Sequence, residues 1–156
     1  MEALDVFDRR IIAALQRDGR MTSIALAELV HLSASQCARR VQRLEEAGVI
    51  QGYRAVLDPA ALGLGIAGLV SVSLERHAKA NIQEFQRQVQ ARPAIVECLS
   101  VTGDSDYQLR IVARDLQEFS ALLLDAIVPM PGVSTTRSSV ILEQVKPFRA
   151  LPIAEE

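Results

Sequence analysis

The 156-residue sequence has few of the side chains that carry metal, disulfide or nucleophilic chemistry. It contains two cysteines, two histidines and no tryptophan. Cys37 and Cys98 lack the paired spacing of metal sites and disulfide frameworks, which fits a reducing cytoplasm. His31 and His77 build no Cys/His or Ser/His constellation, and a phosphate-binding GxxxxGK[ST] motif is absent. We therefore expect no enzyme, no metal site and no cofactor.

The sequence also lacks long apolar runs and a strong charge balance. No run approaches the ~20 apolar residues that a membrane helix needs. The first residues, MEALDVFDRR, are charged and lack the apolar core of a signal peptide. The composition, 49% hydrophobic and 23% charged, is too apolar for a disordered chain. We expect a cytoplasmic protein with no membrane partner. Because the net charge is -2, any case for nucleic acid must rest on a local patch.

The first fifty residues have the apolar spacing of three short helices. The first is capped by Asp5 and ends near Gly19, and the second begins at Thr22 or Ser23. His31 then interrupts the pattern at a tight turn. Such turns usually have glycine in a left-handed conformation, which histidine tolerates better than most residues. We interpret His31 as a turn residue rather than a metal ligand.

The third helix is predicted from about Ala34 to Ala47, with Ser33 as its N-cap and Gly48 as its left-handed C-cap. Cys37, Val41 and Leu44 share one face, which we expect to pack on the other two helices. The remaining surface carries Ser35, Gln36, Arg39, Arg40 and Arg43. Residues 1–50 hold seven Lys+Arg and seven Asp+Glu, so these arginines form a patch within a neutral domain.

A short helix, a tight turn and a helix that starts with small polar residues form the layout of a helix-turn-helix. In that motif the second helix enters the major groove N-terminus first. Ser33, Ser35 and Gln36 would then approach bases and phosphates. The arginines would line the groove, because a guanidinium matches both phosphate oxygens and guanine edges. The alternative is an ordinary solvated helix face, with Glu45 and Glu46 as ion-pair partners.

The remaining hundred residues predict the order β-α-β-β-α-β of a ferredoxin-like domain. The strands are expected at residues 67–74, 95–102, 107–113 and 133–145, with a helix in each of the two long gaps. Two helices cover one face of such a sheet and leave the other bare. Val70, Val72 and Leu74 supply apolar groups either to that face or to the helices. A second subunit is the simplest cover for a bare face.

The whole sequence resembles the Lrp/AsnC family of leucine-responsive and feast/famine transcription regulators. The segments that carry the resemblance are LDVFDRRIIAALQRDGR, LAELVHLSASQCARRVQRLEEAGVIQGYRAVLDP, VTGDSDYQLRIVARDL and PGVSTTRSSVILEQVKPFRALP. They are similar to the family's opening helix, its helix-turn-helix with hinge, its effector loop and its closing strand with tail. The departures are His31 in the turn and Ala34-Ser35 where many members have Pro-Ser or Pro-Thr.

The resemblance implies an α+β chain with an N-terminal winged helix-turn-helix and a C-terminal ferredoxin-like βαββαβ domain. It implies a homodimer, commonly assembled to a tetramer or octamer, that binds pseudo-palindromic double-stranded promoter DNA. It also implies a small effector, usually an amino acid, where effector domains meet. The positions that match the family's effector site are Ser100, Gly103, Asp104, Asp106, Tyr107, Ser139 and Val140. The expected domains are residues 1–50, a hinge at 51–62, and residues 63–156.

The Gly-Asp-Ser-Asp stretch at residues 103–106 has the chemistry that an amino acid would need. Asp104 or Asp106 could pair with an ammonium, and backbone N–H groups near Gly103 could hold a carboxylate. The alternative is a plain hairpin turn, since Gly and Asp are common turn residues. Calcium is a weaker interpretation, because the loop lacks the ligands of an EF-hand.

Two other functions compete with regulation of transcription. An enzyme on a ferredoxin-like fold has only the fold in its favour, and fold does not determine function. The second is a stand-alone amino-acid-sensing protein that regulates a partner enzyme, which leaves the first fifty residues without a role. The sequence thus predicts a sequence-specific DNA-binding regulator that responds to a small effector.

Overall fold

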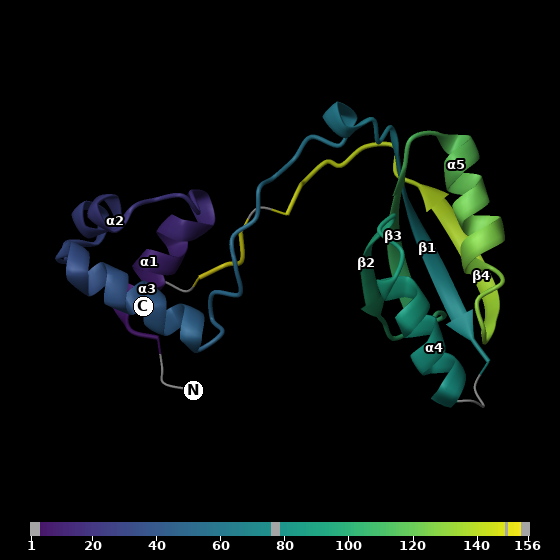
Figure 1. The fold of residues 1–156 in the computed structure, drawn as a ribbon, viewed down its shortest axis with the longest axis horizontal. Coiled ribbons are helices and arrows are strands. Elements are labelled where there is room, and N and C mark those ends of the chain that lie inside the picture. Colours follow the sequence, from purple (N-terminus) through teal and green to yellow (C-terminus); the bar gives the residue numbers. More distant parts are fainter. Residues whose placement is uncertain (1–3, 76–78, 149, 154–156) are drawn as a thin grey trace. The chain divides into compact units, whose positions relative to one another are not determined.

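The computed structural model describes residues 4–75, 79–148 and 150–153. The chain forms two compact units, one from residues 1–56 together with 146–156, and one from residues 57–145 (Figure 1). Among the helices that the structure describes, none is long and apolar enough to cross a membrane.

The first unit contains α1 (Val6–Arg17), α2 (Ser23–Val30) and α3 (Ala34–Glu46). The predicted N-caps Asp5 and Ser33 each accept a hydrogen bond from a backbone N–H in the first turn, and of the two candidates for α2 it is Thr22 that does so. His31 is left-handed, with φ 58° and ψ 47°, and closes the turn between α2 and α3 as predicted. The order helix, helix, turn, helix is therefore fixed largely by local sequence.

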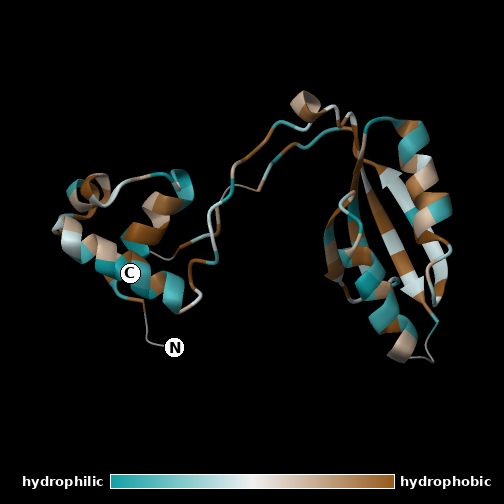
Figure 2. Cartoon of the chain, viewed as in Figure 1, coloured by the Kyte–Doolittle hydropathy of each residue, from teal (hydrophilic) through white to brown (hydrophobic). Residues whose placement is uncertain are grey.

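The core of the first unit lies among the three helices. Its buried apolar residues are Ile11, Ala14, Leu26, Val30, Cys37 and Leu44. Val41 packs against this cluster, so the predicted inner face of α3 is confirmed. Figure 2 shows apolar and polar residues side by side along α1 and α3.

The buried carboxylate of Asp8 binds two of the three arginines that the sequence places on the outward face of α3. Asp8 of α1 is 1% exposed and accepts from Arg40 Nη1 at 2.8 Å and from Arg43 Nη2 at 2.6 Å. Arg40 Nη1 also donates to Asp5 Oδ2 at 2.7 Å, and its guanidinium lies 5.5 Å from the centre of the Phe7 ring. The prediction that Arg40 lies on the outward face is wrong: its side chain points to α1. The carboxylates that pair with it lie more than thirty residues earlier in the sequence, where a search within the third helix does not find them.

The pKa directions agree with this ion-pair network. Hydrogen bonds to Asp5 and then to Asp8 raise the pKa of Arg40. Burial alone would raise the pKa of Asp5, but the hydrogen bonds from the Asp8 backbone and from Arg40 outweigh it and hold that pKa below its usual value. Asp5 thus stabilises the fold above about pH 4, and its contribution is lost as the pH falls through its lowered pKa.

The second unit is a four-stranded antiparallel sheet with the order β2-β3-β1-β4. The strands are β1 (Ile66–Leu74), β2 (Ile95–Ser100), β3 (Tyr107–Ala113) and β4 (Val133–Val140). The helices are α4 (Lys79–Gln90) and α5 (Leu116–Ala121), which continues as a π-helical turn, η2 (Leu122–Ile127); a short 3₁₀ turn, η1 (Ala60–Leu62), precedes β1. This is the predicted ferredoxin-like arrangement. The last strand is shorter than predicted, because residues 141–145 form no strand.

α4 and α5 both lie on one face of the sheet (Figure 1). Val70, Val72 and Leu74 are buried in one cluster with Phe85 and Phe119 of these helices. The alternative that these residues face the bare side of the sheet is therefore excluded. Their neighbours along β1, including Leu69, alternate to the other face, which no described element of this unit covers.

The end of the chain differs from the predicted domain limits. Residues from Lys146 onward group with the first unit, although the prediction placed residues 63–156 in the second domain. The physical reason is a pair of hydrogen bonds. Gln16 Nε2 donates to the Leu151 carbonyl at 3.1 Å, and the Leu151 N–H donates to Gln16 Oε1 at 2.6 Å.

The Asp8 network predicts that Arg40→Ala destabilises the first unit. The substitution leaves the buried Asp8 carboxylate with fewer charged donors, which we expect to cost about 2 kcal/mol. Arg39→Ala is the matched control, because Arg39 is exposed and its loss should stay within about 0.5 kcal/mol. Urea unfolding of the full chain, followed by circular dichroism, measures both. Equal unfolding midpoints for the two variants would contradict the structural role of Arg40.

Candidate DNA-binding helix and effector loop

The exposed start of α3 is held by its own polar side chains. The Ser33 N–H donates to Gln36 Oε1 at 3.0 Å, and the Gln36 N–H donates to Ser33 Oγ at 3.2 Å, which completes a capping box. The hydroxyls of Ser33 and Ser35 lie 3.1 Å apart. All three side chains are exposed, so this end of the helix presents hydroxyl and amide groups to a ligand.

The three arginines of α3 are not equivalent. Arg39 is exposed and has no ion-pair or hydrogen-bond partner among the residues that the structure describes. Arg40 is 25% exposed and holds Asp5 and Asp8, whereas Arg43 is 48% exposed while bonded to Asp8. Arg39 is therefore the arginine of α3 that is most available to a phosphate or a base.

The outward face of α3 also includes a residue that the prediction omitted. Gln42 is exposed and follows Ser35 and Arg39 at helical spacing, so all three lie on one face. Its Nε2 donates to Glu46 Oε1 at 2.8 Å, one turn further along. The helical spacing of residues 35, 39 and 42 was the signal that could have identified it.

The loop at residues 101–106 is tied to the end of β1. The Asp106 N–H donates to the Val72 carbonyl at 3.0 Å, and Asp106 Oδ2 accepts from the Leu74 N–H at 2.7 Å. Ser73 Oγ donates to the Asp104 carbonyl at 3.3 Å. Gly103 has φ 117°, which a residue with a side chain rarely adopts. The carboxylates of Asp104 and Asp106 are both exposed, and Asp106 also serves as a structural acceptor.

Tyr107 and Ser100 lie beside this loop but differ in exposure. The Tyr107 ring is buried, with its centre 4.9 Å from that of Phe85, and its hydroxyl accepts from Gln86 Nε2 at 3.0 Å. Tyr107 is thus part of the core under α4. Ser100 is its exposed partner in the register of β2 and β3.

The predicted effector residues fall into two groups within one chain. The loop lies beside Val72 and Leu74 of β1, whereas Ser139 and Val140 pair with Leu69 and Gly68 near the other end of that strand. Four residues of strand separate Val72 from Gly68, which corresponds to about 13 Å. One chain therefore does not bring the seven predicted residues together.

Within the described parts of the chain, no group of three or more His, Cys, Asp or Glu side chains is arranged to hold an ion. His31 serves in the turn between α2 and α3, and His77 lies outside the described residues.

Comparison with known proteins matches both units to families. Residues 4–51 match a model for winged helix-turn-helix DNA binding, and residues 68–151 match the Lrp/AsnC ligand-binding domain. The leucine-responsive regulatory protein of Rhizobium meliloti is 40% identical over 143 residues, 92% of each chain. That of Escherichia coli is 39% identical over 150 residues, 96% of this chain and 92% of the other.

Solved structures agree with these matches. A Neisseria meningitidis transcriptional regulator in complex with L-Met superposes with a TM-score of 0.92 at 36% identity, covering 96% of this chain and 97% of the other. An AsnC-family regulator of Agrobacterium tumefaciens gives 0.89 at 32% identity over 96% and 97%. With an exposed polar helix after a left-handed turn in one unit and a ferredoxin-like ligand-binding domain in the other, this chain belongs to the Lrp/AsnC family of DNA-binding transcriptional regulators.

Proposed function

We propose that this protein binds pseudo-palindromic promoter DNA as a homo-oligomer and that an amino acid bound between effector domains changes that binding. The observation that carries the second part is the separation of the effector candidates. The loop and the Ser139–Val140 pair lie at opposite ends of β1, so a site that uses both needs a second copy of the chain.

On DNA, α3 would occupy the major groove. Ser33, Ser35 and Gln36 at its start would approach bases and phosphates, and Arg39 would supply the most available guanidinium. Arg43, which is 48% exposed although it bonds to Asp8, would add positive charge to the same surface. Arg40 would orient α3 through Asp5 and Asp8 rather than contact DNA. Two copies of α3 on a symmetric dimer would read two half-sites.

In the effector domain, the exposed carboxylates of Asp104 and Asp106 favour an ammonium, and the backbone near Gly103 offers N–H groups for a carboxylate. An α-amino acid carries both charges. Leucine-responsive names among the relatives and the L-Met complex of the Neisseria regulator make L-leucine and L-methionine the first compounds to test. Assembly to a tetramer or octamer would cover the open sheet face, where Leu69 and Leu99 are exposed.

The DNA proposal predicts that Arg39→Ala weakens binding without loss of stability. If Arg39 contacts a phosphate, the slope of log affinity against log salt should fall by about one. If it contacts a guanine, preference at that base should relax by about 1–3 kcal/mol. Fluorescence anisotropy with DNA from upstream of the protein's own gene measures both effects. Arg87→Ala, on α4, removes the same charge from the other unit and is the control.

Parental affinity in Arg39→Ala at every salt concentration would refute the role of Arg39. A parent protein that binds no DNA at all would instead favour the stand-alone sensing protein.

The effector proposal predicts a selective loss in Asp106→Asn. The amide oxygen still accepts from the Leu74 N–H, so the loop should keep its shape, but the charge that would hold an ammonium is gone. Loss of a charge-assisted hydrogen bond should weaken amino-acid binding about ten- to hundredfold. Isothermal titration with L-leucine and L-methionine measures the affinity, and thermal unfolding checks the fold. Asp125→Asn, an exposed carboxylate on η2, is the matched control. If Asp106→Asn and Asp125→Asn both bind like the parent, the carboxylate of Asp106 is a loop residue only.

A further inference from the structure

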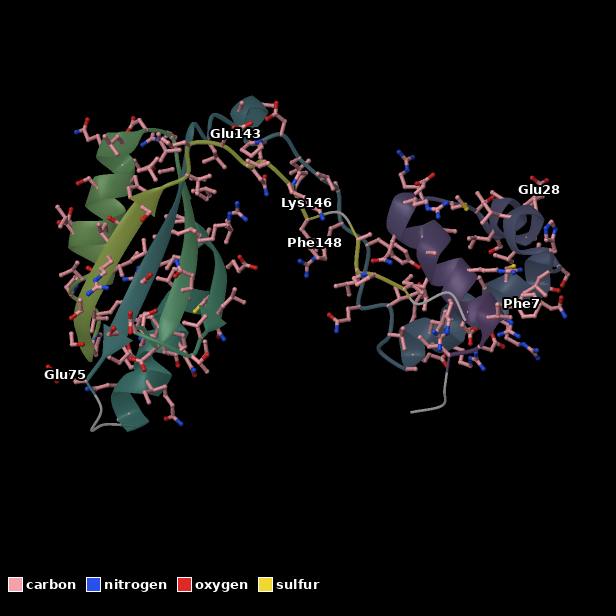
Figure 3. All side chains as sticks on the ribbon, turned by 180° about the vertical axis from the view of Figure 1, so that it is seen from behind. Phe7, Glu28, Glu75, Glu143, Lys146 and Phe148 are labelled. Carbon is pink, nitrogen blue, oxygen red and sulfur yellow. The ribbon has the colours of Figure 1, made fainter. Side chains whose placement is uncertain are left out.

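The two units are joined by two chain segments rather than one. The chain leaves the first unit after Val56 and returns to it at Lys146. The returning segment follows β4 directly, so it begins next to Ser139 and Val140 of the ligand-binding domain. Leu142 and Val145, which precede the return to the first unit, are almost fully exposed. Phe148, which belongs to the first unit, is also largely exposed, and Figure 3 labels it with Lys146 on this segment.

The returning segment ends in a specific contact with α1. The Gln16 side-chain amide both donates to and accepts from the backbone of Leu151, as a neighbouring β-strand would do. Leu151, Pro152 and Ile153 also line a groove of about 680 Å³ together with Ile12 and Leu15 of α1. Leu151 remains 64% exposed, so this contact can open at low cost compared with the core of the unit.

At its opposite end, α1 contacts α3, the helix that is proposed to enter the major groove. Asp5 caps α1 and Asp8 lies in its first turn, and these two residues bind Arg40 of α3. Gln16 is the residue before the last of α1, about 12 Å from Asp8 along the axis at the rise of an α-helix. A packed helix transmits a displacement over this length, because its backbone hydrogen bonds and its core contacts resist bending.

We propose that residues 141–148 and 150–153 act as a strap that couples the ligand-binding domain to α3, with Gln16 as its anchor on α1. Ligand-dependent displacement of β4 pulls on the strap, and α1 passes the change to α3 through Asp5, Asp8 and Arg40. The outgoing segment is itself held to α3, because the Tyr53 hydroxyl donates to Glu45 of α3 at 2.9 Å. This inference rests on the proposed function, and it assigns the route by which the effector acts.

Two substitutions break the anchor from opposite sides. Gln16→Ala removes the side-chain amide, and Leu151→Pro removes the backbone N–H that donates to Gln16. Neither position lies on α3 or in the effector loop. Gln117→Ala, an exposed glutamine on α5, is the matched control. The double variant shows whether both substitutions act on one contact, because their effects are then non-additive.

The experiment measures affinity for the upstream DNA with and without millimolar L-leucine or L-methionine, on the full chain of the parent and each variant. Effector coupling in regulated proteins typically changes affinity about 5–150-fold. We expect Gln16→Ala, Leu151→Pro and the double variant each to keep the parent's amino-acid affinity and DNA affinity without amino acid, while the effect of the amino acid on DNA falls below about twofold. Gln117→Ala should behave like the parent.

Each other outcome overturns the inference in a recognisable way. Variants that respond as strongly as the parent would show that the strap carries no signal, while the proposed function stands. Variants with an altered oligomer size in light scattering, or with weakened DNA binding before any amino acid is added, would assign the tail to assembly or to folding. A parent that binds no DNA, or responds to neither amino acid, would overturn the proposed function and the strap together.

Discussion

The buried carboxylate of Asp8 is the constraint on which the DNA-binding unit depends. A charge at 1% exposure is costly unless it is paired, and its pairing requires Arg40 and Arg43 of α3 to approach α1 at a fixed angle. The apolar contacts of Ile11, Cys37 and Leu44 are non-directional, whereas the ion pairs fix the positions of two side chains of α3. In this arrangement Ser35, Arg39 and Gln42 face outward.

The ligand-binding domain has its core on one side of its sheet only. Its core is completed on the helix side of the sheet, where Val70, Val72, Phe85 and Phe119 pack together. Within a single chain, no described element of this unit covers the other face of the sheet, and the loop at residues 101–106 stays largely exposed. The hydrogen bond from the Leu74 N–H to Asp106 holds the loop against β1, and Asp104 and Asp106 remain exposed. A domain of this kind can gain a binding site by assembly without any change in its own core.

Features set by local sequence were predictable. The caps Asp5, Thr22 and Ser33, the left-handed His31 and the inner face of α3 depend on residues within one or two helical turns. The order of strands and helices followed from apolar periodicity, and the sheet order from the usual topology of that element order.

Features set by distant partners were not predictable. Arg40 was assigned to the DNA face because its partners Asp5 and Asp8 belong to another helix. The contact of the tail with α1 is equally hidden, because Gln16 and Leu151 lie 135 positions apart. The separation of Ser139 and Val140 from the loop follows from strand register, which a single sequence does not reveal.

If α3 occupies the major groove as proposed, its outward Ser35–Arg39–Gln42 face lies against the bound DNA. Site-specific photocrosslinking tests it most directly, with a photoreactive side chain at position 42 on the outward face and, for comparison, at position 117 on α5. The account predicts that position 42 crosslinks to bases within the bound upstream DNA and that position 117 does not. Crosslinking from position 117 alone would contradict it, because the DNA would then lie against the ligand-binding domain.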